Sequence, residues 1–111
     1  MSSTSIANTG LLHPTEILKV PNYVNTAVLA AGVGQAFDTP AGCQYVAFGA
    51  NCDFYAKYGS TAAAVPTTSL STGEGCEINP TARNIGSINA TTGLSLISAS
   101  GGNVTMSWYT P

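Results

Sequence analysis

The chain has 111 residues, which is enough for one compact domain and too few for two. Its net charge is −2, and three scattered cations (Lys19, Lys57 and Arg83) cannot neutralise several phosphates, so nucleic-acid binding is excluded. The longest mostly apolar stretch, residues 24–36, is interrupted by polar residues and is too short to cross a bilayer, which excludes a membrane-spanning helix.

The first twelve residues have the composition of an extended N-terminal arm. They are rich in Ser, Thr, Asn and Gly, and their few apolar residues follow no period. This segment is either a frayed terminus or an arm that becomes ordered on a neighbouring subunit, and the two interpretations carry equal weight. In the second case we expect Leu11, Leu12, His13 and Pro14 to anchor it. The arm lacks the cationic and apolar regions of a signal peptide, so we expect the protein to remain in the cytoplasm where it is made.

From Thr15 to Tyr58 the chain shows the signals of short β-strands. β-prone runs at residues 15–20, 25–30, 35–38, 43–48 and 52–58 are separated by Gly, Pro and Asn. Residues 52–58 alternate, with Phe54 and Ala56 on one face and Tyr55 and Lys57 on the other, as expected of a half-buried strand. Because a short Gly-Ala-Asn turn separates the last two runs, we expect residues 43–58 to form a hairpin.

The second half of the chain contains a long loop and further short strands. Residues 59–75 are rich in Ser, Thr, Ala and Gly and predict a loop, and residues 76–78 predict a short strand. At residues 79–84 we expect a helical turn, with Asn79 as its cap and Pro80 in its first position. Strands are expected at 94–99 and 104–109, and in the last of these Val104, Met106 and Trp108 share one face.

Seven or eight short strands at spacings near ten residues favour an all-β fold. We therefore expect a single antiparallel β-sandwich or jelly-roll-like domain at residues 13–111, preceded by the arm at 1–12. No helical period of the length needed for alternating strands and helices occurs in the sequence, so a parallel sheet is not expected.

The residues that usually carry chemistry are scarce. A nucleophilic triad needs a histidine base, and the single histidine, His13, precedes the first predicted strand next to a proline. Of the five carboxylates only Glu74 and Glu77 are close in sequence, and no calcium-loop spacing is present. The three cysteines (Cys43, Cys52 and Cys76) have no metal-site spacing and are best interpreted as reduced thiols. We therefore expect no enzyme activity, no cofactor and no metal.

The candidate functional residues are those suited to a protein interface. Tyrosine is favoured at interfaces because it combines a large contact area with one polar end. Tyr55 and Tyr109 fall on the polar faces of their predicted strands and are candidates for partner contact. Arg83 is first interpreted as the local partner of Glu77 across the Asn79-Pro80 turn, and second as a contact to a partner protein.

Residues 54–109 resemble a known group of proteins. The order is an aromatic strand (Phe54 to Tyr58), a Thr-Ala-Ala-Ala-Val-Pro loop, a Glu-Ile-Asn-Pro-Thr-Ala-Arg turn at 77–83, and a terminal aromatic strand ending at Tyr109. This order is similar to that of small structural proteins of tailed bacteriophages, several of which are capsid decoration or cement proteins. The resemblance covers about half of the chain. It implies a non-enzymatic β-sandwich that bridges subunits of the major capsid protein on the outer surface of the virion, after synthesis in the bacterial cytoplasm.

Two alternatives remain open from the sequence. One is a receptor- or glycan-binding β-sandwich, and the other is a neck or tail adaptor of a phage. The low charge, 7% of residues, favours association, and 11 Ser and 14 Thr supply an uncharged polar surface. We therefore expect a homo-oligomer, with a dimer favoured because two-fold association is the commonest case.

Overall fold

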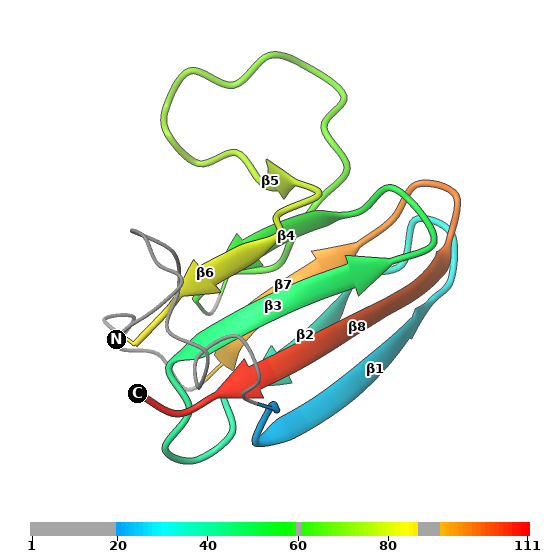
Figure 1. Cartoon of the computed structure of the whole chain (residues 1–111). Helices are drawn as coiled ribbons and strands as arrows, with labels where there is room; N and C mark the ends of the chain where they lie inside the picture. The colour runs from blue at the N-terminus through cyan, green and yellow to red at the C-terminus, as the bar shows by residue number, and fades with distance from the viewer. Residues whose placement is uncertain (1–19, 60, 87–91) are drawn as a thin grey trace, which may run out of the picture.

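The computed structural model describes residues 20–59, 61–86 and 92–111, and throughout these ranges the protein is all-β (Figure 1). In these ranges eight strands form two antiparallel sheets that pack face to face as a β-sandwich. The predicted arm at 1–12, its anchor Leu11, Leu12, His13 and Pro14, and residues 15–19 of the first predicted strand lie outside the described residues.

Each sheet contains four strands. Sheet I has the order β1-β8-β3-β6 and sheet II the order β2-β7-β4-β5. The strands of sheet I are β1 (Tyr23–Leu29), β8 (Gly102–Tyr109), β3 (Tyr45–Ala50) and β6 (Ala82–Asn84). The strands of sheet II are β2 (Gln35–Asp38), β7 (Thr92–Ile97), β4 (Tyr55–Tyr58) and β5 (Glu77–Ile78).

The pairing is nested along the chain. β1 pairs with β8, β2 with β7, β3 with β6 and β4 with β5, and all of these pairs are antiparallel. The chain is therefore wound like one long hairpin folded into two layers. The predicted hairpin at 43–58 is wrong, because β3 and β4 belong to different sheets and residues 51–54 cross between the layers.

The predicted helical turn at 79–84 is also wrong. Asn79 adopts a left-handed backbone conformation (φ +46°), and residues 82–84 form strand β6. The side chain of Asn79 does not cap a helix. Its Oδ1 accepts the Phe54 N–H at 3.0 Å, while the Asn79 N–H donates to the Phe54 carbonyl at 2.9 Å. Asn79 thus continues the contact between β4 and β5 beyond the last strand pair.

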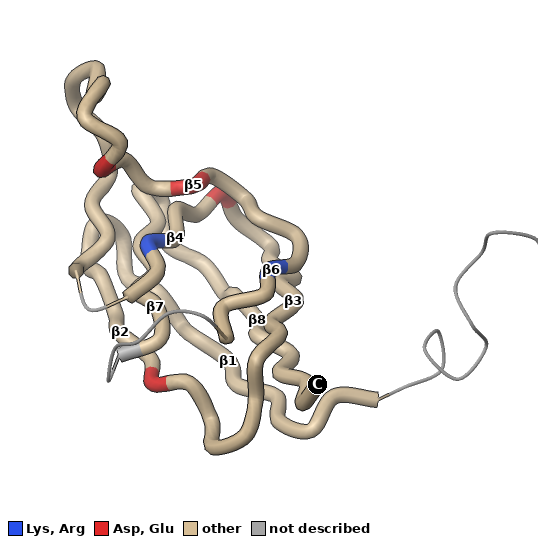
Figure 2. The backbone as a smooth tube through the Cα atoms, turned by 90° about the vertical axis from the view of Figure 1, so that its left-hand side faces the viewer, with Lys and Arg blue, Asp and Glu red and all other residues tan. Residues whose placement is uncertain are grey.

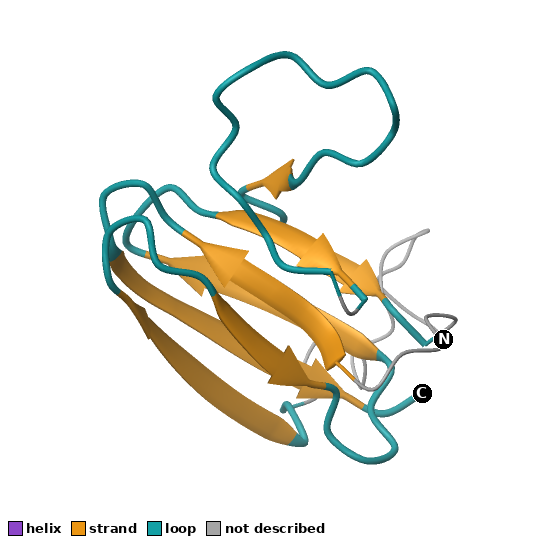
Figure 3. Ribbon diagram, turned by 180° about the vertical axis from the view of Figure 1, so that it is seen from behind, coloured by secondary structure: helices purple, strands orange, loops and turns teal. Residues whose placement is uncertain are grey.

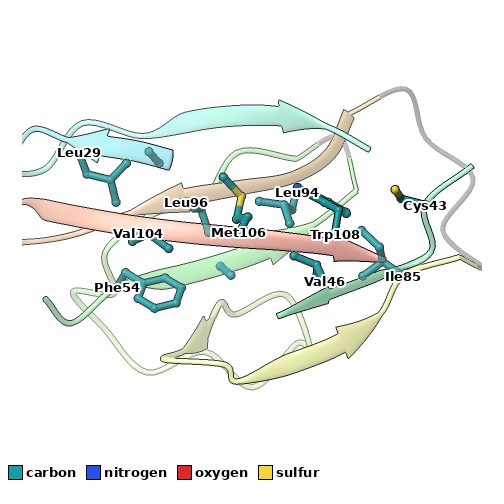
Figure 4. Packing of buried hydrophobic residues seen from close by; sticks show 12 residues of the cluster. Leu29, Cys43, Val46, Phe54, Ile85, Leu94, Leu96, Val104, Met106 and Trp108 are labelled. Atoms are coloured by element: carbon teal, nitrogen blue, oxygen red, sulfur yellow. The ribbon is translucent and has the colours of Figure 1, made fainter. Parts of the chain in front are cut away.

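The core lies between the two sheets and confirms the alternation predicted for the last strand. Val104, Met106 and Trp108 of β8 are fully buried, and they pack against Leu94 and Leu96 of β7 (Figure 4). The indole N–H of Trp108 has no hydrogen-bond partner in the part of the chain that the structure describes. Its lost hydrogen bond to water is offset by the large apolar area that the ring buries.

The outer faces of the two sheets differ in what covers them. On sheet II, the start of the long loop lies over β7, because the Ala63 N–H donates to Ser95 Oγ at 2.9 Å and both residues are buried. Beyond Pro66 the loop projects away from the sheets, and its Leu70 is exposed (Figure 3). On sheet I, the described side chains of the outer face are exposed or half-buried. Among the described residues, sheet I is therefore the open broad surface of the sandwich.

Candidate interaction surfaces

The outer face of sheet I carries no charged side chain among the described residues. The strand register and the alternation of inward and outward residues define this face. Its members are small or uncharged: Val24, Thr26, Val28, Tyr45, Ala47, Gly49, Ala82, Asn84, Asn103, Thr105, Ser107 and Tyr109. We call this set the neutral face. Figure 2 shows the charged residues of the described chain on β2, β4, β5, β6 and the connecting loops, away from β1, β8 and β3.

Tyr45 and Tyr109 form the aromatic end of the neutral face. They are register partners on β3 and β8, and they line a shallow pocket of about 260 Å³ together with Val46, Ala47, Ala82, Arg83 and Asn84. The prediction that Tyr109 lies on the polar side of its strand is confirmed. Tyr45 was not predicted as a site residue, although its alternation with the buried Val46 indicates the same side.

Tyr55 lies on the opposite side of the molecule. It alternates with the buried Phe54 and Ala56, and its register partners are Ile78 of β5 and Ile97 of β7. This places Tyr55 on the outer face of sheet II, where it is half-buried. The structure therefore does not bring the predicted interface residues Tyr55 and Tyr109 together on one surface.

Arg83 is held in a local cluster, as its first interpretation predicts. From the edge strand β6 it reaches across to Glu77 of β5, donating from Nε to both carboxylate oxygens at 3.0 and 3.1 Å and forming an ion pair through Nη2. Tyr58 Oη donates to Glu77 Oε1 at 2.7 Å. We call Tyr58, Glu77 and Arg83 the edge clamp, because they connect the edge strands of the two sheets.

The electrostatics of the edge clamp favour the charged pair. Hydrogen bonds from Arg83 and then Tyr58 hold the pKa of the Glu77 carboxyl below its ordinary value. Burial first, and the hydrogen bond to Glu77 second, raise the pKa of Tyr58. Since the guanidinium is already occupied by Glu77, the geometry supports a structural role for Arg83 more directly than a contact to a partner.

An open hollow of about 650 Å³ lies beside the edge clamp, between the β3–β4 and β5–β6 connections. Three of its polar side chains are paired: Asn79 Nδ2 donates to Asp53 Oδ1 at 3.0 Å, and Asn51 Oδ1 accepts the Asn103 N–H at 2.8 Å. A sugar site needs free polar groups beside an exposed aromatic ring, whereas in this hollow Phe54 is buried and Phe48 is half-buried. The hollow therefore does not have the chemistry of a glycan site.

The described residues offer few groups that could hold a metal ion. Within residues 20–59, 61–86 and 92–111, no three His, Cys, Asp or Glu side chains come together as a metal site would require. All three cysteines are free thiols; Cys43 is buried, and Cys52 and Cys76 are half-buried. In the same ranges no helix is long and apolar enough to cross a membrane.

No known protein family, curated protein or solved structure matches this chain.

Proposed function

We propose that this protein is a non-enzymatic decoration (cement) protein of a tailed-phage capsid, and that it binds subunits of the major capsid protein on the outer surface of the virion. The observation that carries the proposal is the neutral face: a broad, exposed sheet surface without charge on a sandwich that offers no metal-binding cluster among its described residues. Such a face can lie against a protein shell without desolvating any charge.

The strand order supports the same proposal. The nested pairs, arranged as β1-β8-β3-β6 and β2-β7-β4-β5, have the order of an eight-stranded jelly roll. Viral capsid domains use this architecture, and so do lectins, so the support is by analogy of fold. The resemblance of residues 54–109 to decoration proteins favours the viral role over the lectin role.

The attachment is expected to be multivalent. A homodimer carries two neutral faces, and each needs only a modest affinity when both bind the same shell, because the second contact forms at a high effective concentration. Association with capsids takes place in the bacterial cytoplasm, where the chain is synthesised.

The experiment is co-sedimentation of the purified protein with mature capsids that lack it, followed by heating the capsids with and without it. Saturable binding and a higher disruption temperature are expected. If a folded, β-rich protein does not bind, the cement function is wrong, and a neck or tail adaptor takes its place.

A pair of variants tests which surface binds. Ser107→Glu places a charge in the centre of the neutral face, whereas Thr68→Glu places the same charge on the exposed loop at the other side of the molecule. We expect Ser107→Glu to weaken capsid binding at least tenfold and Thr68→Glu to leave it unchanged. The reverse result would assign attachment to the loop and overturn the role of the neutral face.

A further inference from the structure

The edge strand β1 differs from the other sheet edges of the described chain because it is long and regular and carries neither a charge nor a proline. Edge strands are usually shortened, bulged or charged, because their free backbone groups bind other strands. β5 has two residues, β6 has three and carries Arg83, and β2 has four with a register irregularity before Asp38. β1 has seven residues in unbroken register with β8, without a charge or a proline.

The backbone groups that β1 directs toward its free edge can be identified. Asn103 of β8 exchanges hydrogen bonds with Asn51 on its β3 side, so its register partner Val28 directs its own N–H and carbonyl away from β8. The carbonyl of Val28 accepts a hydrogen bond from Gln35 Nε2 at 2.7 Å, in agreement with this orientation. Because the direction alternates along a strand, Val24 and Thr26 also direct their backbone groups to the free edge.

These three residues have the same order, Val-Thr-Val, in both directions along the strand. Val24, Thr26 and Val28 belong to the neutral face, and Thr26 is the central residue of Tyr23–Leu29. A two-fold axis through Thr26 sets Val24 opposite the partner's Val28 and Thr26 opposite the partner's Thr26. These are the positions whose backbone groups are directed outward, so all of the facing pairs are hydrogen-bonded pairs. With no charge on β1, the two identical strands meet without like-charge repulsion.

We propose that β1 pairs antiparallel with β1 of a second copy of this chain and joins the two copies of sheet I into one continuous eight-stranded sheet. The neutral faces of the two copies then become one surface of twice the width. In each copy the Gln35 side chain already donates to the Val28 carbonyl. When the strands pair, Gln35 turns aside or shares that carbonyl, since a carbonyl oxygen can accept two hydrogen bonds. This pairing is the contact of the homodimer that the proposed function includes. It is inferred from β1 and does not depend on capsid binding.

The test measures the mass of the purified full chain by sedimentation velocity in the absence of capsids. Wild type is expected at twice the chain mass. Thr26→Lys and Thr26→Glu each set two like charges directly opposite each other, and each is expected to be a monomer. An equimolar mixture of the two variants sets Lys opposite Glu and is expected to form a dimer again, a rescue that an unfolded variant could not show.

Thr105→Lys is the matched control. Thr105 is the register partner of Thr26 on the neutral face, one strand away from the edge, and its variant is expected to remain a dimer. A wild type that stays monomeric at high concentration overturns the proposal, as does a dimer that persists in both Thr26 variants. A wild-type monomer that dimerises after deletion of residues 2–19 assigns the edge to the chain's own N-terminal segment and also overturns it. If Thr26→Lys is monomeric yet still binds capsids, the pairing is supported and capsid binding does not require it.

Discussion

At the residue scale, Gly101 closes the turn between β7 and β8 in a conformation that only glycine adopts without strain. Its φ is +82°, and a Cβ there would lie 2.9 Å from the Leu29 carbonyl oxygen and 3.1 Å from the Ala31 nitrogen. We expect Gly101→Ala to lower the free energy of unfolding by roughly 2–4 kcal/mol, because a left-handed L-residue costs about 1–2 kcal/mol and the contact adds to it. Urea unfolding followed by the fluorescence of Trp108, the single tryptophan, measures the loss.

Gly73 provides the control for this substitution. It has a similar φ of +86°, but a Cβ there would meet no atom within 4 Å. Gly73→Ala is therefore expected to show the backbone strain alone, about 1–2 kcal/mol. Equal losses at the two positions would contradict the contact proposed for Gly101.

Asn79 shows why the sequence predicts some local structure wrongly. An Asn-Pro pair fits the start of a helix, but asparagine also tolerates a left-handed backbone better than most residues. The deciding interactions are with Phe54, 25 residues earlier in the chain. A local pattern cannot include a hydrogen-bond partner at that separation.

At the element scale, the sequence predicted the faces of the strands but not their pairing. The alternation that buries Phe54 just before β4, Ala56 within β4 and Trp108 in β8 is visible in the sequence because it depends only on neighbouring residues. A hairpin and a crossing between layers have the same alternation and the same turn residues. β3 and β4 are therefore indistinguishable from a hairpin until their partners β6, β8, β5 and β7 are known.

The edge clamp makes stability depend on pH at the acidic end. The pKa of Glu77 is lowered in the folded state from an ordinary value of 4.5, so the folded chain releases its proton more readily than the unfolded chain. The stabilisation is present above pH 4.5 and is lost as the pH falls through the lower folded pKa. We expect Glu77→Gln to be less stable than wild type at pH 7 and to lose less stability between pH 7 and pH 3, measured by urea unfolding.

Tyr58→Phe is the second variant to compare with wild type in this pH experiment. It removes the hydrogen bond to Glu77 but keeps the ion pair with Arg83, so part of the acid dependence is expected to remain. Because the pKa of Tyr58 is raised from 10.0, its stabilisation is present below pH 10 and falls at higher pH, and the variant is expected to lack that loss. Acid profiles that are identical for wild type and Glu77→Gln would show that the edge clamp does not contribute.

At the scale of the whole molecule, the sequence indicated an uncharged surface but not where it lies. The low charge was evident from composition, whereas its consequence depends on the register that sets Ser107 beside Val24 and Ala47. The two predicted interface tyrosines show why the location of a surface could not be predicted from the sequence. Tyr55 and Tyr109 have the same pattern in their strands, yet the two sheets carry them to opposite sides.

The neutral face leads to a prediction about ionic strength. Contacts between exposed charges are screened as salt rises, with a Debye length of about 10 Å at 0.1 M falling to about 3 Å at 1 M, whereas contacts of uncharged surfaces are not. Since the neutral face carries no charged side chain, we expect the affinity for capsids to change less than about threefold between roughly 50 mM and 500 mM NaCl, as measured by co-sedimentation.

Arg83→Glu distinguishes attachment through the edge clamp from attachment through the neutral face. It breaks the edge clamp and places a carboxylate beside Glu77, so we expect lower stability but unchanged capsid binding at temperatures where the protein is folded. A steep fall of wild-type binding with salt, together with lost binding of folded Arg83→Glu, would assign attachment to the edge clamp. Salt-independent binding that Ser107→Glu abolishes and Arg83→Glu retains would assign it to the neutral face.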